Sequence, residues 1–161
     1  MILSFIQNFP WGGQTYFDLK IAKGLIDNGI VKENYTILIP GHIKQKIHTI
    51  REDKKDRWNS YRIIHMFYNA RQKGMRPIAP VVPCVSTQKV RIEYTGKQGV
   101  EIYIDDNIFY SQSKHGMTNV IHRDRMQILS HNDGFDSTED FFRWFDKDFK
   151  GKIIHWTNFK Y

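Results

Sequence analysis

The chain has 161 residues, of which 40% are hydrophobic and 14% aromatic, and this composition excludes a disordered protein and fits one domain over residues 1–161. No apolar run approaches the roughly 20 residues that a membrane-spanning helix needs, so we expect no membrane partner. The net charge of +7 favours polyanionic partners. Cys84 is the only cysteine, which excludes an intrachain disulfide and, with an apolar start too short for a signal sequence, predicts a cytoplasmic protein.

The first forty residues predict a strand, a helix and a second strand. Ile2–Ile6 is apolar enough for a strand. Thr15 is a candidate N-cap for a helix that runs to about Asp27 and stops at Gly29. The apolar run Thr36–Ile39, closed by a proline and a glycine, predicts a short strand.

The next segment, Lys46–Asp53, combines cations, a hydroxyl and isoleucines. In an extended segment Thr49 and Arg51 would project to one face and Ile50 to the other, because side chains alternate. Lys46 falls on the opposite parity unless a turn or bulge intervenes. Two interpretations stay open: a site for an anionic or strongly polar ligand, and a solvated, charge-rich edge strand.

The middle of the chain predicts further strands. Arg62–Asn69 alternates in the period of two that marks a half-buried strand. Arg71–Pro83 holds three of the five prolines and predicts a loop. Val85–Tyr94 and Val100–Asp105 alternate again on either side of a glycine-bounded turn, which predicts a hairpin.

The last third predicts two helices and a closing strand. After a polar connection at Tyr110–Thr118, Val120–Ser130 has the spacing of a helix. Ser137 opens a second helix with a capping box, and Gly151 ends it. Ile153–Trp156 predicts the closing strand. The aromatic residues of the second helix are predicted to pack in the core: Phe141, Phe142, Trp144, Phe145 and Phe149.

Taken together, these elements predict an α+β fold, with a small curled sheet or barrel and helices packed against it. The segment from Lys44 to Arg62 is locally rich in cations and also carries Trp58 and Tyr61. Cations interleaved with aromatic faces are common where proteins bind nucleic acids. We therefore expect a nucleic acid or a nucleotide as the partner, with no specific anionic partner as the alternative, while the oligomeric state stays open.

Two blocks of sequence carry a family resemblance. The first is Lys46–Trp58, with Lys-x-x-Thr-x-Arg at its start, and the second is Asn132–Trp156, with Asp-Gly-Phe near its start. In this order they resemble the ASCH domain of the PUA-like superfold. The resemblance implies a small PUA-like β-barrel with flanking helices, an insertion around residues 26–40, and a cleft that binds RNA or a nucleoside-like ligand without a cofactor.

The resemblance also implies roles for individual residues. The best-defined enzymes among the relatives that the resemblance implies are bacterial amidohydrolases, which remove the acetyl group from N4-acetylcytidine. Their catalytic Lys and Thr match Lys46 and Thr49. Their catalytic carboxylate corresponds to Asp133, a shorter Asp in place of Glu. We expect Arg51 to bind ligand or to hold its strand. The further expected ligand-binding residues are Trp58, His155 and Trp156, with core packing as the alternative for Trp156.

Amide hydrolysis by such a set has a simple chemical basis. Thr49 would be the nucleophile if a desolvated Lys46 lost its proton and acted as the base. Asp133 would orient Lys46 or bind the cytosine amine. Because the shorter Asp draws the carboxylate back by one methylene, we rank ligand binding above turnover.

Three functions from different classes follow. The first is ASCH-type binding of RNA or a nucleoside or nucleotide, and the second is a metal-independent amidohydrolase of acylated nucleosides. The third is a protein-interaction or regulatory role without catalysis, for example in a phage. We predict no metal site, because His122, His131 and His155 do not show a paired ligand spacing.

Overall fold

The computed structural model describes residues 1–32, 38–96, 99–112 and 120–161. Within these ranges the chain forms three helices and nine strands. In chain order they are β1 (Ile2–Phe5), α1 (Phe17–Asp27), β2 (His48–Arg51), β3 (Ile63–Tyr68), β4 (Arg76–Pro77), β5 (Val82–Pro83), β6 (Ser86–Tyr94), β7 (Val100–Ile104), β8 (Asn107–Gln112), α2 (Val120–Asn132), α3 (Thr138–Trp144) and β9 (Phe149–His155).

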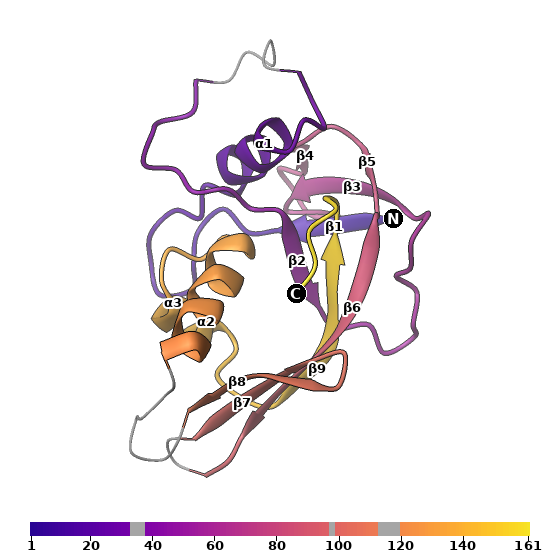
Figure 1. Cartoon of the computed structure of the whole chain (residues 1–161). Helices are drawn as coiled ribbons and strands as arrows, with labels where there is room; N and C mark the ends of the chain where they lie inside the picture. Colours follow the sequence, from indigo (N-terminus) through magenta and orange to yellow (C-terminus); the bar gives the residue numbers. More distant parts are fainter. Residues whose placement is uncertain (33–37, 97–98, 113–119) are drawn as a thin grey trace.

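The predicted α+β class is confirmed, and the strands lie in two sheets (Figure 1). The larger sheet has the order β2-β9-β6-β7-β8 and is antiparallel at each pairing. The smaller sheet has β3 at its centre, parallel to β1 and antiparallel to β4 and β5. The described strands are not closed into a barrel, so the barrel expected from the resemblance is absent from this part of the chain.

Period-two alternation located several of these strands correctly. The hairpin prediction is confirmed by β6 and β7, and β3 buries Ile64, Met66 and Tyr68 as alternation requires. The predicted polar connection from Tyr110 is wrong at its start, because Tyr110–Gln112 belongs to β8, which pairs with β7. Residues 113–118 of that connection lie outside the described residues.

Helix α1 starts differently from the prediction. Its N-cap is Tyr16, with φ 51° and without a capping side-chain hydrogen bond. Thr15 instead uses its hydroxyl to donate to the carbonyl of Ile6 at 2.8 Å, so it fastens the preceding loop and is not the N-cap. The strand expected at Thr36–Ile39 lies partly outside the described residues, as does the expected insertion around 26–40, and residues 38 and 39 are not in a strand.

Helix α3 begins as predicted and ends earlier. The Ser137 side chain accepts a hydrogen bond from the Asp140 N–H at 3.0 Å, which confirms the cap. The helix stops at Trp144, and Phe149, predicted to extend its apolar face, opens β9 opposite Ile92. The correction has a tertiary cause: Phe149–His155 pairs with β6 along its whole length, and its last four residues also pair with β2.

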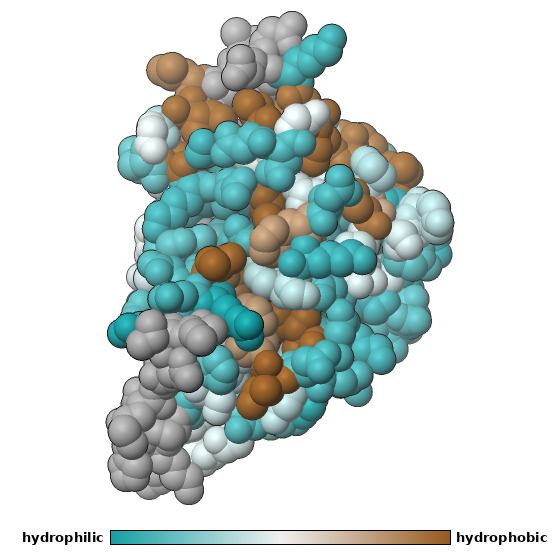
Figure 2. Space-filling model, viewed as in Figure 1, coloured by the Kyte–Doolittle hydropathy of each residue, from teal (hydrophilic) through white to brown (hydrophobic). Residues whose placement is uncertain are grey.

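The core joins both sheets to the helices. Buried apolar side chains come from β1 and β3, from α1, and from the strands of the larger sheet, including Leu3, Ile21, Ile64, Ile92 and Ile154. On the face shown in Figure 2, hydrophilic residues cover most of the surface, and hydrophobic residues show through near α1. Within the described ranges, the helices are too short or too polar to cross a bilayer.

Candidate functional site

Lys46 lies just before β2 and is positioned by α1. Its backbone N–H donates to the carbonyl of Lys20 in α1 at 2.8 Å. Gly24 faces the Lys46 carbonyl so closely that a Cβ at this glycine would lie 2.3 Å from the carbonyl oxygen. Regular pairing of β2 begins only at His48. Strand parity therefore does not apply to Lys46, and its side chain can reach the same site as those of Thr49 and Arg51.

Asp133 meets Lys46 from the C-terminal end of α2. Its Oδ1 accepts hydrogen bonds from Lys46 Nζ at 2.9 Å and from the backbone N–H of Ile50 at 3.1 Å. Lys46 Nζ also donates to the backbone carbonyl of Asp133. Both residues are buried, with exposed fractions of 1% for Lys46 and 4% for Asp133. The pair therefore fastens the end of α2 to the start of β2.

Gly134 makes this approach possible. Its φ is +91°, in the region that favours glycine. A Cβ at this position would lie 2.8 Å from Lys46 Cδ and 2.8 Å from the ring of Phe17. Steric crowding therefore explains the glycine in the Asp-Gly-Phe motif, because a larger residue at this position would displace Lys46 from Asp133.

Burial and ion pairing shift the pKa values of Lys46 and Asp133 in opposite directions. Burial lowers the pKa of Lys46 to about 8, although the nearby Asp133 carboxylate raises it. For Asp133, burial alone would raise the pKa, but the Lys46 ammonium and the His48 ring hold it below its usual value. The pair is therefore ionised at neutral pH, and Lys46 can lose its proton under mildly alkaline conditions.

Lys46, Thr49, Arg51 and Asp133 line one small pocket with a cavity volume of about 40 Å³. Its walls are largely aromatic: Phe5, Phe9, Phe17, Phe135 and Trp144. The ring centroids of Phe9 and Phe135 lie 5.9 Å apart, and those of Phe135 and Trp144 lie 6.4 Å apart. Such a lining suits the edge of a flat, partly polar ligand, because ring faces can stack while the polar groups fix its orientation.

Arg51 connects the pocket to the smaller sheet. Its Nη2 donates to the carbonyl of Ser4 in β1 at 2.9 Å, and its guanidinium lies 5.1 Å from the centroid of the Phe5 ring. Its buried Nε has no hydrogen-bond partner within the described residues. Arg51 therefore holds β2 near β1.

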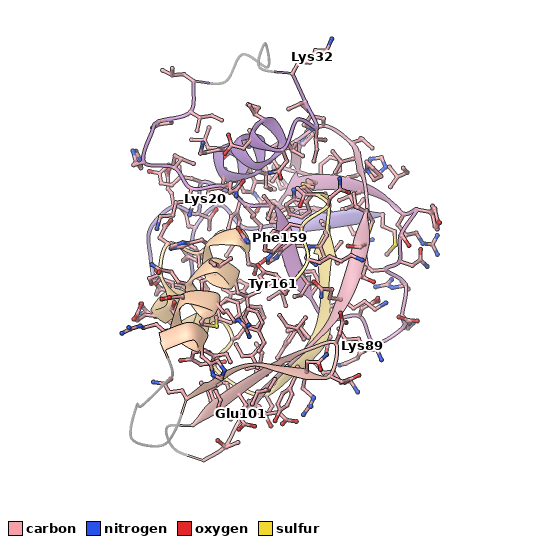
Figure 3. The ribbon with its side chains drawn as sticks, in the orientation of Figure 1. Lys20, Lys32, Lys89, Glu101, Phe159 and Tyr161 are labelled. Atoms are coloured by element: carbon pink, nitrogen blue, oxygen red, sulfur yellow. The ribbon has the colours of Figure 1, made fainter. Side chains whose placement is uncertain are left out.

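A chain of polar contacts leads from Asp133 to the end of the sequence. His48 Nδ1 lies 3.6 Å from Asp133 Oδ1, and His48 Nε2 lies 2.7 Å from the Tyr161 hydroxyl. Asn132 Nδ2 donates to the same hydroxyl at 3.1 Å. Tyr161 is held between α2 and the larger sheet (Figure 3), where its backbone N–H donates to Gln88 Oε1 at 3.0 Å. Sequence reasoning assigned no role to His48 or Tyr161.

The remaining predicted ligand-binding residues do not line the pocket. Trp58 is 4% exposed and packs in the core, but it also borders a second, open groove beside Arg51 and Arg57. His155 is buried in β9 with its ring centroid 5.3 Å from that of His48. Trp156 is 1% exposed and packs in the core, which is the alternative raised for it from the sequence. Their roles as ligand contacts stay predictions.

The aromatic walls could be recognised only in part from the sequence. Phe135 belongs to the Asp-Gly-Phe motif, and Trp144 lies on the apolar stripe that we assigned to the core. Phe5, Phe9 and Phe17 come from separate parts of the chain, and nothing in their local sequence distinguishes them from core residues.

Comparison of the chain with protein-family models, with curated proteins and with solved structures found no match.

Proposed function

We propose that the chain binds a nucleobase-containing ligand, in the manner expected of an ASCH-type protein of the PUA-like superfold, in the pocket formed by Lys46, Thr49, Arg51 and Asp133. One observation carries the proposal: these four polar residues open onto a single pocket whose walls are aromatic. A base can stack on the aromatic rings and exchange hydrogen bonds with the polar side chains. RNA, nucleosides and nucleotides all contain such a base.

Binding of cytidine to the purified chain tests this proposal, with Thr49→Val as the pocket variant. Valine keeps the branched shape of threonine and removes only the hydroxyl. Thr87→Val is a matched control, because Thr49 and Thr87 both lie opposite Ile154, one on each side of β9, and Thr87 does not line the pocket. We expect Thr49→Val to weaken binding about fivefold, as for one lost hydrogen bond, and Thr87→Val to leave it unchanged.

Arg51→Ala provides a second variant with a larger expected effect. It removes a charged donor beside the pocket, so we expect cytidine affinity to fall at least tenfold while the far-ultraviolet circular dichroism stays native. Wild-type protein that fails to bind any of the four common ribonucleosides would reject the proposal. That result would favour the protein-interaction or regulatory role.

The ion pair favours a second candidate function, hydrolysis of an acylated nucleoside such as N4-acetylcytidine. The lowered pKa of Lys46, about 8, makes its neutral form accessible as a base. In the proposed step Lys46 takes the Thr49 hydroxyl proton as the oxygen attacks the acyl carbon. The carbon–nitrogen bond then breaks, and Lys46 returns the proton to the departing amine. Water would hydrolyse the resulting acyl ester and regenerate Thr49.

Incubation of N4-acetylcytidine with the chain, followed by chromatography, tests this second function. We expect acetate and cytidine to form with the wild type and with Thr87→Val, and not with Thr49→Val or Lys46→Ala. Unchanged substrate after a long incubation, in protein that binds cytidine, would restrict the pocket to recognition.

A further inference from the structure

Beside the pocket lies an open groove that carries three arginines, Arg51, Arg57 and Arg71, and a single carboxylate, Glu52. We call it the arginine groove. Glu52 lies 3.0 Å from Lys54 Nζ, so a neighbouring cation already offsets its charge. The groove therefore has an excess of positive charge, and it forms where the segment after β2 and the turn after β3 approach β1.

Two of these arginines differ from Arg51 in how exposed their side chains are. Arg57 and Arg71 are exposed, and their guanidinium groups make neither a hydrogen bond nor an ion pair within residues 1–32, 38–96, 99–112 and 120–161. Their backbones are nevertheless anchored. The Arg57 N–H donates to Asp53 Oδ1 at 2.9 Å, and the N–H of Ala70, next to Arg71, donates to Ser4 Oγ at 3.1 Å.

The groove and the pocket share two lining residues. They are Ser4 and Arg51, and Arg51 Nη2 donates to the carbonyl of Ser4 at 2.9 Å. A ligand whose base enters the pocket would therefore place the groups attached to its sugar towards the groove. Guanidinium groups bind phosphate through paired hydrogen bonds, and an excess of exposed arginine attracts polyanions.

We propose that the arginine groove binds the phosphates of a ligand whose base occupies the pocket, so that the ligand is a nucleotide or a nucleic-acid strand in preference to a free nucleoside. This inference rests on the proposed function for the position of the base. Arg51, which also lines the pocket, contacts the base, and Arg57 and Arg71 contact the phosphates.

Binding of cytidine, cytidine 5′-monophosphate and a single-stranded cytidine trinucleotide to the full chain tests this proposal. The groove variant is Arg57→Ala/Arg71→Ala. The control is Arg123→Ala/Lys147→Ala, which removes the same charge from exposed positions outside the pocket and the groove. We expect the wild type to bind the monophosphate about tenfold more tightly than cytidine, and the trinucleotide more tightly still.

The groove variant should lose at least about tenfold in trinucleotide affinity, keep its cytidine affinity within about twofold, and show a shallower salt dependence by about 0.7 per lost phosphate contact. The control should keep all three affinities. Equal wild-type affinity for cytidine and its monophosphate would overturn the proposal, and so would equal losses in the two double variants. If the phosphorylated ligands bind through the groove and cytidine does not bind, the base pocket is rejected and the groove stands. If none of the three ligands binds, both proposals are rejected.

Discussion

The pocket and the arginine groove share Arg51, but their other cations differ in burial and in pairing. In the pocket, Lys46 is buried and paired with Asp133 at 2.9 Å. In the groove, Arg57 and Arg71 are exposed, and their guanidinium groups have no partner among the residues that the structure describes. A buried charge is coupled to folding because its partner must remain in place, whereas an exposed charge is free to meet a ligand. Stability and ligand affinity should therefore separate cleanly between the two regions.

The largest expected effect is on stability, from Lys46→Met. The substitution keeps an apolar chain of similar length and leaves the Asp133 carboxylate buried without its ammonium partner. We expect the free energy of unfolding to fall by about 3–5 kcal/mol, measured by urea denaturation. Lys46→Met/Asp133→Asn is the control, because the amide oxygen can still accept from the Ile50 N–H. This double variant should recover at least half of the loss; an equal loss would show that packing, and not charge, sets the effect.

The pH dependence of stability offers a second test. Burial lowers the pKa of Lys46 from 10.5 to about 8, so between these values the unfolded chain binds more protons than the folded one. Stability should therefore rise with pH across this window, by up to about 3 kcal/mol, and the gain should be lost as pH falls through 8. Urea denaturation of the wild type and of Lys46→Met/Asp133→Asn at several pH values isolates this contribution. Parallel curves for the two proteins would contradict it.

Gly134→Ala should disturb the pocket through crowding. Its Cβ would meet Lys46 Cδ and the Phe17 ring, whereas a Cβ at Gly12, with a similar φ of +95°, would meet nothing within 4 Å. Both substitutions carry the strain of a positive φ, so Gly12→Ala serves as the matched control. We expect Gly134→Ala to destabilise the protein by about 1–3 kcal/mol more than Gly12→Ala in thermal or urea unfolding. Equal losses would mean that the pocket relaxes around the added methyl group.

The smallest expected effect on stability comes from the groove. Arg57→Ala/Arg71→Ala should change the free energy of unfolding by no more than about 0.5 kcal/mol, because neither guanidinium has a partner to lose in the described structure. The same urea titration used for the lysine variants measures it. A loss above 1 kcal/mol would show that the groove is part of the folded framework and not a free surface.

Local patterns in the sequence predicted most elements, and tertiary pairing explains the errors. Alternation in Val85–Tyr94 and Val100–Asp105 was sufficient to locate the hairpin. The apolar spacing of α3 also fitted Phe149, but strand pairing with Ile92 places that residue in β9. The segment Asn107–Gln112 does not alternate between buried and exposed residues, so its sequence did not indicate β8, which pairs with β7 across a register shift.

The candidate site divides in the same way. The motif residues Lys46, Thr49 and Asp133 were grouped from the sequence through the resemblance, and they line one pocket. The contact between His48 and Tyr161 spans 113 positions, and local spacing carries no information about such a pair. The arginine groove likewise depends on how the turn after β3 approaches β1, which only the folded chain determines.

The position of Trp144 has a practical consequence. Its indole forms part of the pocket wall and lies 6.4 Å from the ring of Trp11, whereas Trp58 and Trp156 are buried in the core. A base stacked in the pocket would alter the surroundings of Trp144 and leave the buried indole of Trp156 unchanged, while Trp58 borders the arginine groove. The chain thus carries its own optical probe, and quenching of tryptophan emission, absent in Trp144→Phe, would report occupancy of the pocket without any added label.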